Sequence, residues 1–207
     1  MLSFETQKRL LDIVLAISLF VLFFPIWVLV PLMILADSGL PIFFSHKRVG
    51  KNGKEFNLLK FRSMIQGADD LLHNKNYKLL KKFKDNDWKL QNDPRITALG
   101  KVLRSLTIDE FPQLLNVLRG EMSMVGPRAY VKKELQEQTK KYPETKKYVD
   151  YILSVKPGIT GPWQTGGRNE VSFRVRAKMD ALYAHKKTIW ADIIILLKTP
   201  QAMISKW

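Results

Sequence analysis

The chain contains no cysteine among its 207 residues. This absence excludes a disulfide framework and any thiolate metal site, and it is compatible with a reducing compartment. The three histidines, His46, His73 and His185, lie far apart and show no ligand spacing, so we do not expect a zinc site. A Gly-x-Ser-x-Gly elbow, a Gly-x-Gly-x-x-Gly fingerprint and a Walker A loop are also missing. None of these common catalytic arrangements can therefore account for the function.

Acidic residues are few relative to basic ones, with 19 Asp and Glu against 34 Lys and Arg, for a net charge of +15. Such an excess indicates an anionic partner: nucleic acid, lipid headgroups or a phosphorylated substrate. Nucleic acid is not expected, because no RNP-type aromatic motif or zinc-finger spacing is present. We interpret the lysine pairs within a polar helical stretch, 130–154, as a solvated surface.

Charge is missing altogether from Ile13 to Ala36, a run of 24 residues. A straight helix of that length would span ~36 Å, enough for a ~30 Å hydrocarbon core. Pro25 is expected to break the helix into two arms, each about half a bilayer long. Basic residues flank both ends, which favours a re-entrant hairpin over the alternative, a kinked single span. A cleaved signal peptide is disfavoured, because Ile34 occupies the −3 position before Ala36.

The remaining 170 or so residues can form one domain with its own core. Two apolar-rich runs, 41–49 and 54–61, flank an Asn-Gly pair and predict a β-hairpin. Periodicity and breakers predict helices at 65–83, 99–106, 109–118, 171–185 and 189–197, with a loop at 85–94. The last helix is apolar almost all round, which favours a core position over an interfacial one.

The predicted fold class is α+β, a mostly helical membrane-associated domain with a short β-hairpin. Residues 1–36 would form the re-entrant membrane helix-hairpin, broken near Pro25. Residues 37–207 would form a cytosolic domain with interfacial helices.

The most prominent polar segment runs from Arg104 to Gln113 and contains Asp109 and Glu110. Pro112 fits in the first turn of a helix, because it has no N–H to donate, so both acids are expected near a helix start. Unpaired N–H groups and the helix dipole stabilise a carboxylate there. Asp109 is therefore either a helix N-cap or a nucleophile toward phosphorus, as in aspartyl-phosphate enzymes.

A carboxylate that attacks phosphorus requires cations to screen the approaching anion. The candidates are Lys60, Arg62, Arg104 and Arg128, since arginine can hold phosphate oxygens with a planar fork. Taken singly, each of them is better explained as a surface charge. The loop 156–169, rich in glycine and proline, is either a structural connection or a ligand loop.

Several motifs, in this order, resemble the bacterial sugar transferase family, in its monotopic (PglC-like) form of polyprenyl-phosphate phosphoglycosyl transferase. They are the Pro25-broken apolar start, Lys60–Met64, Arg104–Gln113, Asn116–Arg128, Lys156–Gly161 and Gly167–Asn169. One position departs from the usual pattern, because small members carry Ser-Pro at the break and this chain has Phe24-Pro25.

The resemblance implies transfer of a sugar 1-phosphate from a UDP-sugar to undecaprenyl phosphate on the cytosolic face of the bacterial inner membrane, where it starts glycan assembly. Mg²⁺ is the implied cofactor. By position, Asp109 matches the nucleophile that forms a phosphosugar intermediate as UMP leaves, and Glu110 matches its paired acid. Both are also candidate magnesium ligands, and Lys60, Arg62 and the other candidate cations would bind phosphate.

The segment Gly161–Gln164 resembles members that use a hexose. The loop residues expected to contact the sugar are Lys156, Pro157, Gly158, Gly161, Gln164 and Arg168. The implied partners are the UDP-sugar, undecaprenyl phosphate and the phospholipid bilayer, while a homo-oligomer is left open. The alternative is a membrane-tethered basic adaptor that binds anions without catalysis, which would gain nothing from Asp109 and Glu110.

Overall fold

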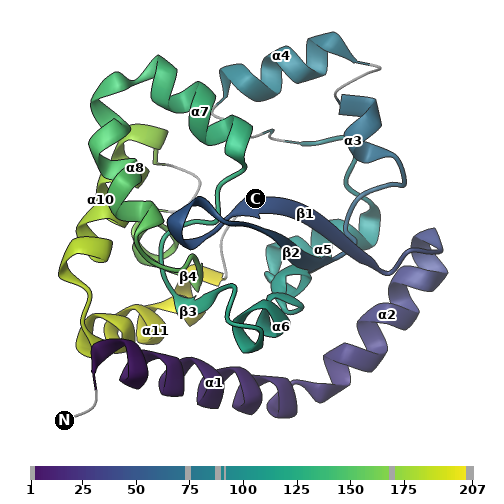
Figure 1. Ribbon diagram of the computed structural model, residues 1–207. Helices are drawn as coiled ribbons and strands as arrows, with labels where there is room; N and C mark the ends of the chain where they lie inside the picture. Colours follow the sequence, from purple (N-terminus) through teal and green to yellow (C-terminus); the bar gives the residue numbers. More distant parts are fainter. Residues whose placement is uncertain (1–2, 73–75, 87–89, 91, 168–170, 204–207) are drawn as a thin grey trace.

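The computed structural model describes residues 3–72, 76–86, 90, 92–167 and 171–203. Within these ranges the chain is mostly helical, and helices surround a central β-hairpin (Figure 1). The longer helices are α1 (Phe4–Leu22), α2 (Phe24–Ser38), α4 (Tyr77–Asp85), α5 (Ala98–Ser105), α6 (Gln113–Leu118), α7 (Lys132–Lys141), α8 (Lys146–Leu153), α10 (Phe173–Lys186) and α11 (Ile189–Met203). The short helical turns are η1 (Lys51–Gly53), α3 (Ala68–Asp70), η3 (Ile108–Glu110), η4 (Pro143–Thr145) and α9 (Pro162–Thr165).

The predicted hairpin is confirmed. Strands β1 (Phe43–Val49) and β2 (Glu55–Phe61) pair antiparallel, in a register that joins Phe43 to Phe61. Asn52 and Gly53 adopt positive φ angles of 57° and 76°, which is why an Asn-Gly pair suits this turn. A second pair, β3 (Ser123–Val125) with β4 (Gly158–Thr160), is parallel and was not predicted.

Helices α1 and α2 meet at an angle of 62°, and the break lies at Phe23, two residues before Pro25. Pro25 occupies the first turn of α2, where its missing N–H has no helical partner to lose. Pro31 lies inside α2 without ending it, and α2 extends to Ser38, beyond the predicted boundary at residue 36. In the described ranges no single helix is long and apolar enough to cross a membrane, whereas the bent pair meets that criterion jointly.

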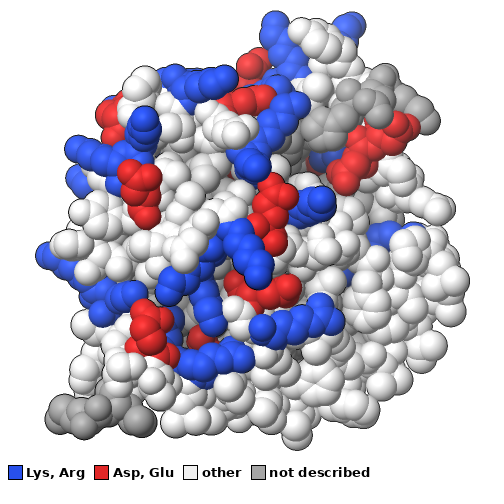
Figure 2. Space-filling model, viewed as in Figure 1, with Lys and Arg blue, Asp and Glu red and all other residues white. Residues whose placement is uncertain are grey.

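The outer faces of α1 and α2 are apolar and exposed. Charged side chains gather over the upper, left and central parts of the face in Figure 2, while the lower right part, where the end of α1 and α2 lie in Figure 1, is nearly free of them. The exposed large apolar residues of the two helices include Leu10, Val14, Ile17, Val21, Leu22, Phe24, Val28, Leu29, Leu32, Met33 and Leu35.

The inner face of α1 is bound to the rest of the domain by polar contacts. The Arg9 guanidinium donates to the carbonyls of Val117 (2.6 Å) and Leu118 (2.8 Å), which are the last two residues of α6. The buried Asp12 carboxylate accepts from the hydroxyl of Ser123 and the backbone N–H of Met124, both at 2.9 Å. These contacts join α1 to α6 and β3.

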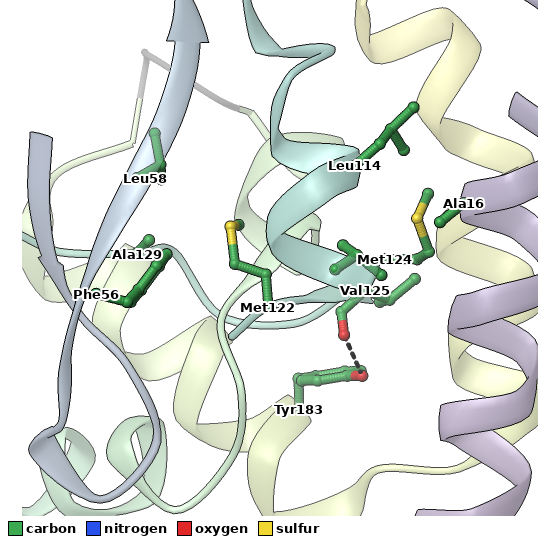
Figure 3. Close-up of a cluster of buried hydrophobic side chains, with 10 residues drawn as sticks. Ala16, Phe56, Leu58, Leu114, Met122, Met124, Val125, Ala129 and Tyr183 are labelled. Atoms are coloured by element: carbon green, nitrogen blue, oxygen red, sulfur yellow. Dashed lines mark hydrogen bonds between the residues drawn. The ribbon is translucent and has the colours of Figure 1, made fainter. Parts of the chain in front are cut away.

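The main core cluster lies between the hairpin, α6, β3 and α10. Figure 3 shows these side chains converging, with the Tyr183 hydroxyl donating to the Val125 carbonyl at 3.1 Å. Its buried members are Ala16, Phe56, Leu58, Leu114, Val117, Met122, Met124, Val125, Ala129 and Tyr183. A second cluster joins α7, α8 and α10, and a third packs α2 against β2 and α5. Strand β2 thus packs on both sides, and Lys60 is fixed in place near its end.

Several predicted helices have other bounds. In place of the predicted helix 65–83 the structure has α3 and α4, and α4 continues to Asp85, the first residue of the predicted loop 85–94. Residues 73–75, between α3 and α4, lie outside the described residues. The stretch 130–154 is α7, η4 and α8, because Pro143 interrupts it, and its lysine pairs are exposed as predicted. The helix expected from residue 109 begins at Gln113 instead.

Helix α11 is longer than predicted, and its expected core position is only partly correct. Ile195 and Leu196 pack against the main core cluster. Trp190 and Leu197 are 75% and 76% exposed, so for these side chains the core interpretation is wrong.

Candidate active site

Asp109 and Glu110 lie in η3, a single turn between α5 and α6. Thr107, immediately before this turn, has φ 59°, a left-handed conformation that a β-branched residue rarely adopts and that costs roughly 1–3 kcal/mol. Thr107 and Pro112 are the N-cap residues of η3 and α6. The interpretation of Asp109 as a helix N-cap is therefore wrong.

The carboxylate of Asp109 is buried beside two cations. The side-chain nitrogen of Lys60 in β2 donates to Asp109 Oδ2 at 3.2 Å and to Glu110 Oε1 at 2.7 Å. Asp109 is 2% exposed, and this burial raises its pKa, while the charges of Lys60 and Arg104 oppose the rise. A carboxylate with little hydration beside cations is well placed to react with an anionic phosphate ester.

Arg104, at the end of α5, is the second cation of this cluster. Its Nε donates to Ser63 Oγ at 2.9 Å, and burial lowers its pKa while the charges of Asp109 and Asp93 raise it. Helix α5 approaches residue 63 very closely, because a Cβ on Gly100 would lie 2.0 Å from the Ser63 carbonyl oxygen. The structure thus brings the predicted residues Lys60, Arg104, Asp109 and Glu110 together.

Arg62 does not join this cluster. Its guanidinium donates to the carbonyls of Leu40 (2.9 Å) and Ser38 (2.8 Å) and also to that of Gly39, and the residue is only 6% exposed. The fork that was expected to hold substrate phosphate instead binds the backbone at the end of α2. The geometry therefore gives Arg62 a structural role and does not support the predicted phosphate contact.

Arg128 lies just after β3, and its guanidinium carbon is 5.0 Å from the centre of the Trp163 ring. Arg48 of β1, which the sequence analysis missed, donates to the Ala129 carbonyl at 3.1 Å. Burial and the charge of Arg128 lower the pKa of Arg48 to about 10, while Glu110 is among the acids that raise it. Arg48 is therefore electrostatically coupled both to Arg128 and to Glu110.

The predicted hairpin could have identified Arg48 as a neighbour of the site. Arg48 pairs with Phe56 and Phe44 pairs with Lys60, so Arg48 and Lys60 lie at alternate positions on one face of the sheet.

The predicted sugar loop has a different placement. Pro157 accepts from the Ser123 N–H at 2.9 Å, and Gly158 donates to the Pro127 carbonyl at 2.9 Å. A Cβ on Gly158 or Gly161 would lie 2.1 Å or 2.0 Å from the backbone of Gly126, so no larger residue fits at either position. These residues therefore fix the backbone from Gly126 to Arg128 by close packing and hydrogen bonds.

The other loop residues differ in their surroundings. Lys156 lines a cavity of about 30 Å³ with Arg9, Asp12 and Tyr183, and burial lowers its pKa. Its neighbours are those of α1, not the Asp109 cluster. Gln164 donates to the Ile159 carbonyl at 3.3 Å, and Arg168 lies outside the described residues.

A metal ion would have two adjacent carboxylates available, those of Asp109 and Glu110. In the described part of the chain no group of three or more His, Asp or Glu side chains could hold a metal. Mg²⁺ is commonly bound by one or two carboxylates and takes its other ligands from water and substrate phosphates. The pair therefore fits a magnesium ion that binds together with a diphosphate.

Comparisons with known proteins identify the family of the chain. The model of the family described as bacterial sugar transferase matches residues 3–206. The chain is 42% identical to the UDP-galactose-lipid carrier transferase of Erwinia amylovora and 40% identical to the undecaprenyl-phosphate galactose phosphotransferase of Salmonella typhimurium. The matches cover 93% and 96% of this chain but only 39% and 40% of those relatives, so it spans about two fifths of their length. The exopolysaccharide production protein ExoY of Rhizobium meliloti is 38% identical, over 95% of this chain and 84% of that relative.

Proposed function

The chain belongs to the bacterial sugar transferase family, and we propose that it transfers a sugar 1-phosphate from a UDP-sugar to undecaprenyl phosphate, releasing UMP. The observation that carries this proposal is the buried Asp109 carboxylate, which lies beside Glu110 and is paired with Lys60. The names of two relatives include galactose, which supports a hexose donor such as UDP-galactose. The product would start the assembly of a membrane glycoconjugate.

The reaction consists of two displacements at one phosphorus atom. A carboxylate oxygen of Asp109 attacks the phosphorus that bears the sugar, and the P–O bond to UMP breaks, so UMP leaves with the electron pair. A phosphate oxygen of undecaprenyl phosphate then attacks the same phosphorus, and the bond to Asp109 breaks. Each displacement inverts the phosphorus, and the second one regenerates the carboxylate.

The side chains around Asp109 would bind the phosphates of the donor and screen their charge. Lys60 and Arg104 lie next to the carboxylate and reduce its repulsion of the incoming diphosphate. Arg48, which is coupled to Glu110 and to Arg128, and Arg128 itself supply further positive charge for the phosphates. Asp109 and Glu110 would hold Mg²⁺, which when bound screens phosphate charge and favours departure of UMP.

The reaction would take place at the cytosolic face of the bacterial inner membrane. The exposed apolar faces of α1 and α2 support a re-entrant hairpin immersed in one leaflet, and Trp190 and Leu197 of α11 support contact with the interface. A lipid phosphate lies at headgroup level, so an enzyme immersed to this depth meets its acceptor there.

Release of UMP tests the transfer reaction. The protein in detergent, with Mg²⁺, undecaprenyl phosphate and a panel of UDP-hexoses, should release UMP with at least one donor. Asp109→Asn keeps the shape of the side chain and should abolish turnover, whereas Asp150→Asn, on the exposed face of α8, should retain it. Intact-protein mass spectrometry without acceptor should show a phosphosugar adduct on the peptide that contains Asp109.

Substantial activity of Asp109→Asn, or sequential kinetics without an adduct, would contradict the role of this residue as the nucleophile. Binding of UDP-sugars without UMP release from any donor would favour the anion-binding adaptor instead.

Tags at the two ends of the chain test the hairpin. Both ends should be accessible from the cytosol, because basic residues flank the apolar segment on both sides. An N-terminal tag that is accessible only from the periplasm would show a full span and contradict the re-entrant arrangement. Pro25→Leu should shift the segment toward such a span, because it restores a hydrogen-bonding N–H at the bend.

A further inference from the structure

The backbone of Arg128 is hydrogen-bonded to Asp180, an acid that has no role in the proposed reaction. The backbone N–H of Arg128 donates to Asp180 Oδ2 at 3.0 Å, and the Tyr130 hydroxyl lies 3.5 Å from the same oxygen. Asp180 is on α10 and is completely buried. It cannot touch a substrate directly, so any effect on the reaction has to pass through Arg128.

The same acid belongs to a buried charge cluster that supports Trp163. Arg176, one turn before Asp180, is also completely buried, and its guanidinium lies 5.6 Å from the centre of the Trp163 ring. Arg176 forms an ion pair with Glu134 of α7 at 3.3 Å. The Trp163 ring thus contacts the guanidinium groups of both Arg176 and Arg128, which lies 5.0 Å away. A fixed indole and a fixed backbone N–H together restrict where Arg128 can point.

Resting on the proposed function, we propose that Asp180 is a positioning residue that holds Arg128 in the orientation in which it binds the diphosphate of the sugar donor. The backbone contact sets where the Arg128 side chain begins, and the contact with Trp163 sets its direction. In its charged form Asp180 accepts the N–H more strongly than a neutral acid would, because hydrogen bonds to an ionised acceptor are stronger.

The charge on Asp180 responds to pH in the neutral range. Burial raises its pKa to about 7, while the N–H and charge of Arg128, the charge of Arg176 and the Tyr130 hydroxyl oppose the rise. Glu134 is a further charged group of this cluster and pairs with Arg176, and Arg48 is electrostatically coupled to Arg128. Protonation near pH 7 therefore weakens the support of Arg128 without altering any group that touches the substrate.

The test is the pH dependence of the donor KM, measured from steady-state UMP release with undecaprenyl phosphate at a saturating concentration. If the ionised form alone is competent, the KM for the donor rises about tenfold between pH 8 and pH 6, because the ionised fraction falls by that factor. Asp180→Asn should show a raised KM at pH 8 that no longer changes down to pH 6, with kcat largely retained. Tyr130→Phe should move the midpoint to higher pH, because it removes a donor that favours the ionised carboxylate.

Thermal unfolding gives a second readout that does not depend on activity. Between about pH 4 and pH 7 folded Asp180 keeps a proton that the unfolded chain has lost, so Tm should fall as pH rises through this range. Asp180→Asn should flatten this slope, while Asp150→Asn should leave it unchanged. If Asp180→Asn folds poorly, the wild-type protein and Tyr130→Phe still show whether the midpoint exists and moves.

The outcomes separate two kinds of failure. No UMP release from the wild-type protein under any condition would overturn the proposed function itself. UMP release with a donor KM that is constant from pH 6 to pH 8, or a lower kcat with unchanged KM in Asp180→Asn, would overturn the positioning role, because it would leave Asp180 as a purely structural residue.

Discussion

Asn116 makes the most direct connection between β2, which carries Lys60, and α6, which follows the acidic pair. Its side chain is fully buried. It accepts from the Leu59 N–H at 3.0 Å and donates to the Asn57 carbonyl at 2.8 Å and to Glu121 Oε2 at 2.7 Å. Asn116→Ala removes three hydrogen bonds and leaves their partners unsatisfied. At roughly 1 kcal/mol each, the expected loss in the free energy of unfolding is about 3 kcal/mol.

For a domain of about 200 residues this loss corresponds to a fall in Tm of roughly 6–12 °C, measurable by circular dichroism in detergent micelles. The control is Asn57→Ala on the same strand, because the Asn57 side chain is exposed and its carbonyl is unchanged. Turnover should also fall in Asn116→Ala, since Leu59 precedes Lys60. If the Tm values of the two variants differ by less than about 2 °C, the three contacts contribute little and the reasoning is refuted.

Two further substitutions test the support of the site. In an ordinary helix Gly100→Ala would be stabilising by up to ~1 kcal/mol. Here it should lower Tm, because the new Cβ would lie 2.0 Å from the Ser63 carbonyl oxygen. The control is Lys101→Ala, an exposed position on α5, and equal Tm values for the two variants would contradict the close contact. Arg62→Lys should cost about 2 kcal/mol of stability, because one ammonium cannot replace the fork at the end of α2, while the kcat of the folded protein is retained. A large loss of UMP release with unchanged Tm would instead restore Arg62 as a phosphate ligand.

Local patterns in the sequence predicted the local structure well. The Asn-Gly turn predicted the hairpin, and periodicity predicted α5, α10 and the start of α11. The strands β3 and β4 are three residues each, which is too short for periodicity to register. The motif around Asp109 and Glu110 identified the residues that the structure places with Lys60 and Arg104.

Pairings between distant parts of the chain could not be predicted. Glu134 lies among the lysine pairs that were interpreted as a solvated surface, yet it is buried against Arg176, 42 residues later. Lys8 forms an ion pair with Asp192, 184 residues away, and a pattern in either segment alone does not reveal it. Arg62 illustrates the same limit, because a motif shows that a cation is present but not which oxygens it binds.

The contacts of Arg9 and Asp12 mean that α1 is an integral part of the domain, although its outer face is apolar and exposed. Cutting the helix away to obtain a soluble fragment would uncover the last carbonyls of α6 and the start of β3, both of which it satisfies. If the two helices lie in a membrane as proposed, a water-soluble form is better sought by keeping them and exchanging outward side chains, such as Leu29 and Leu32, for polar ones. In this protein the surface can be redesigned for solubility, but the segment that carries it cannot be removed.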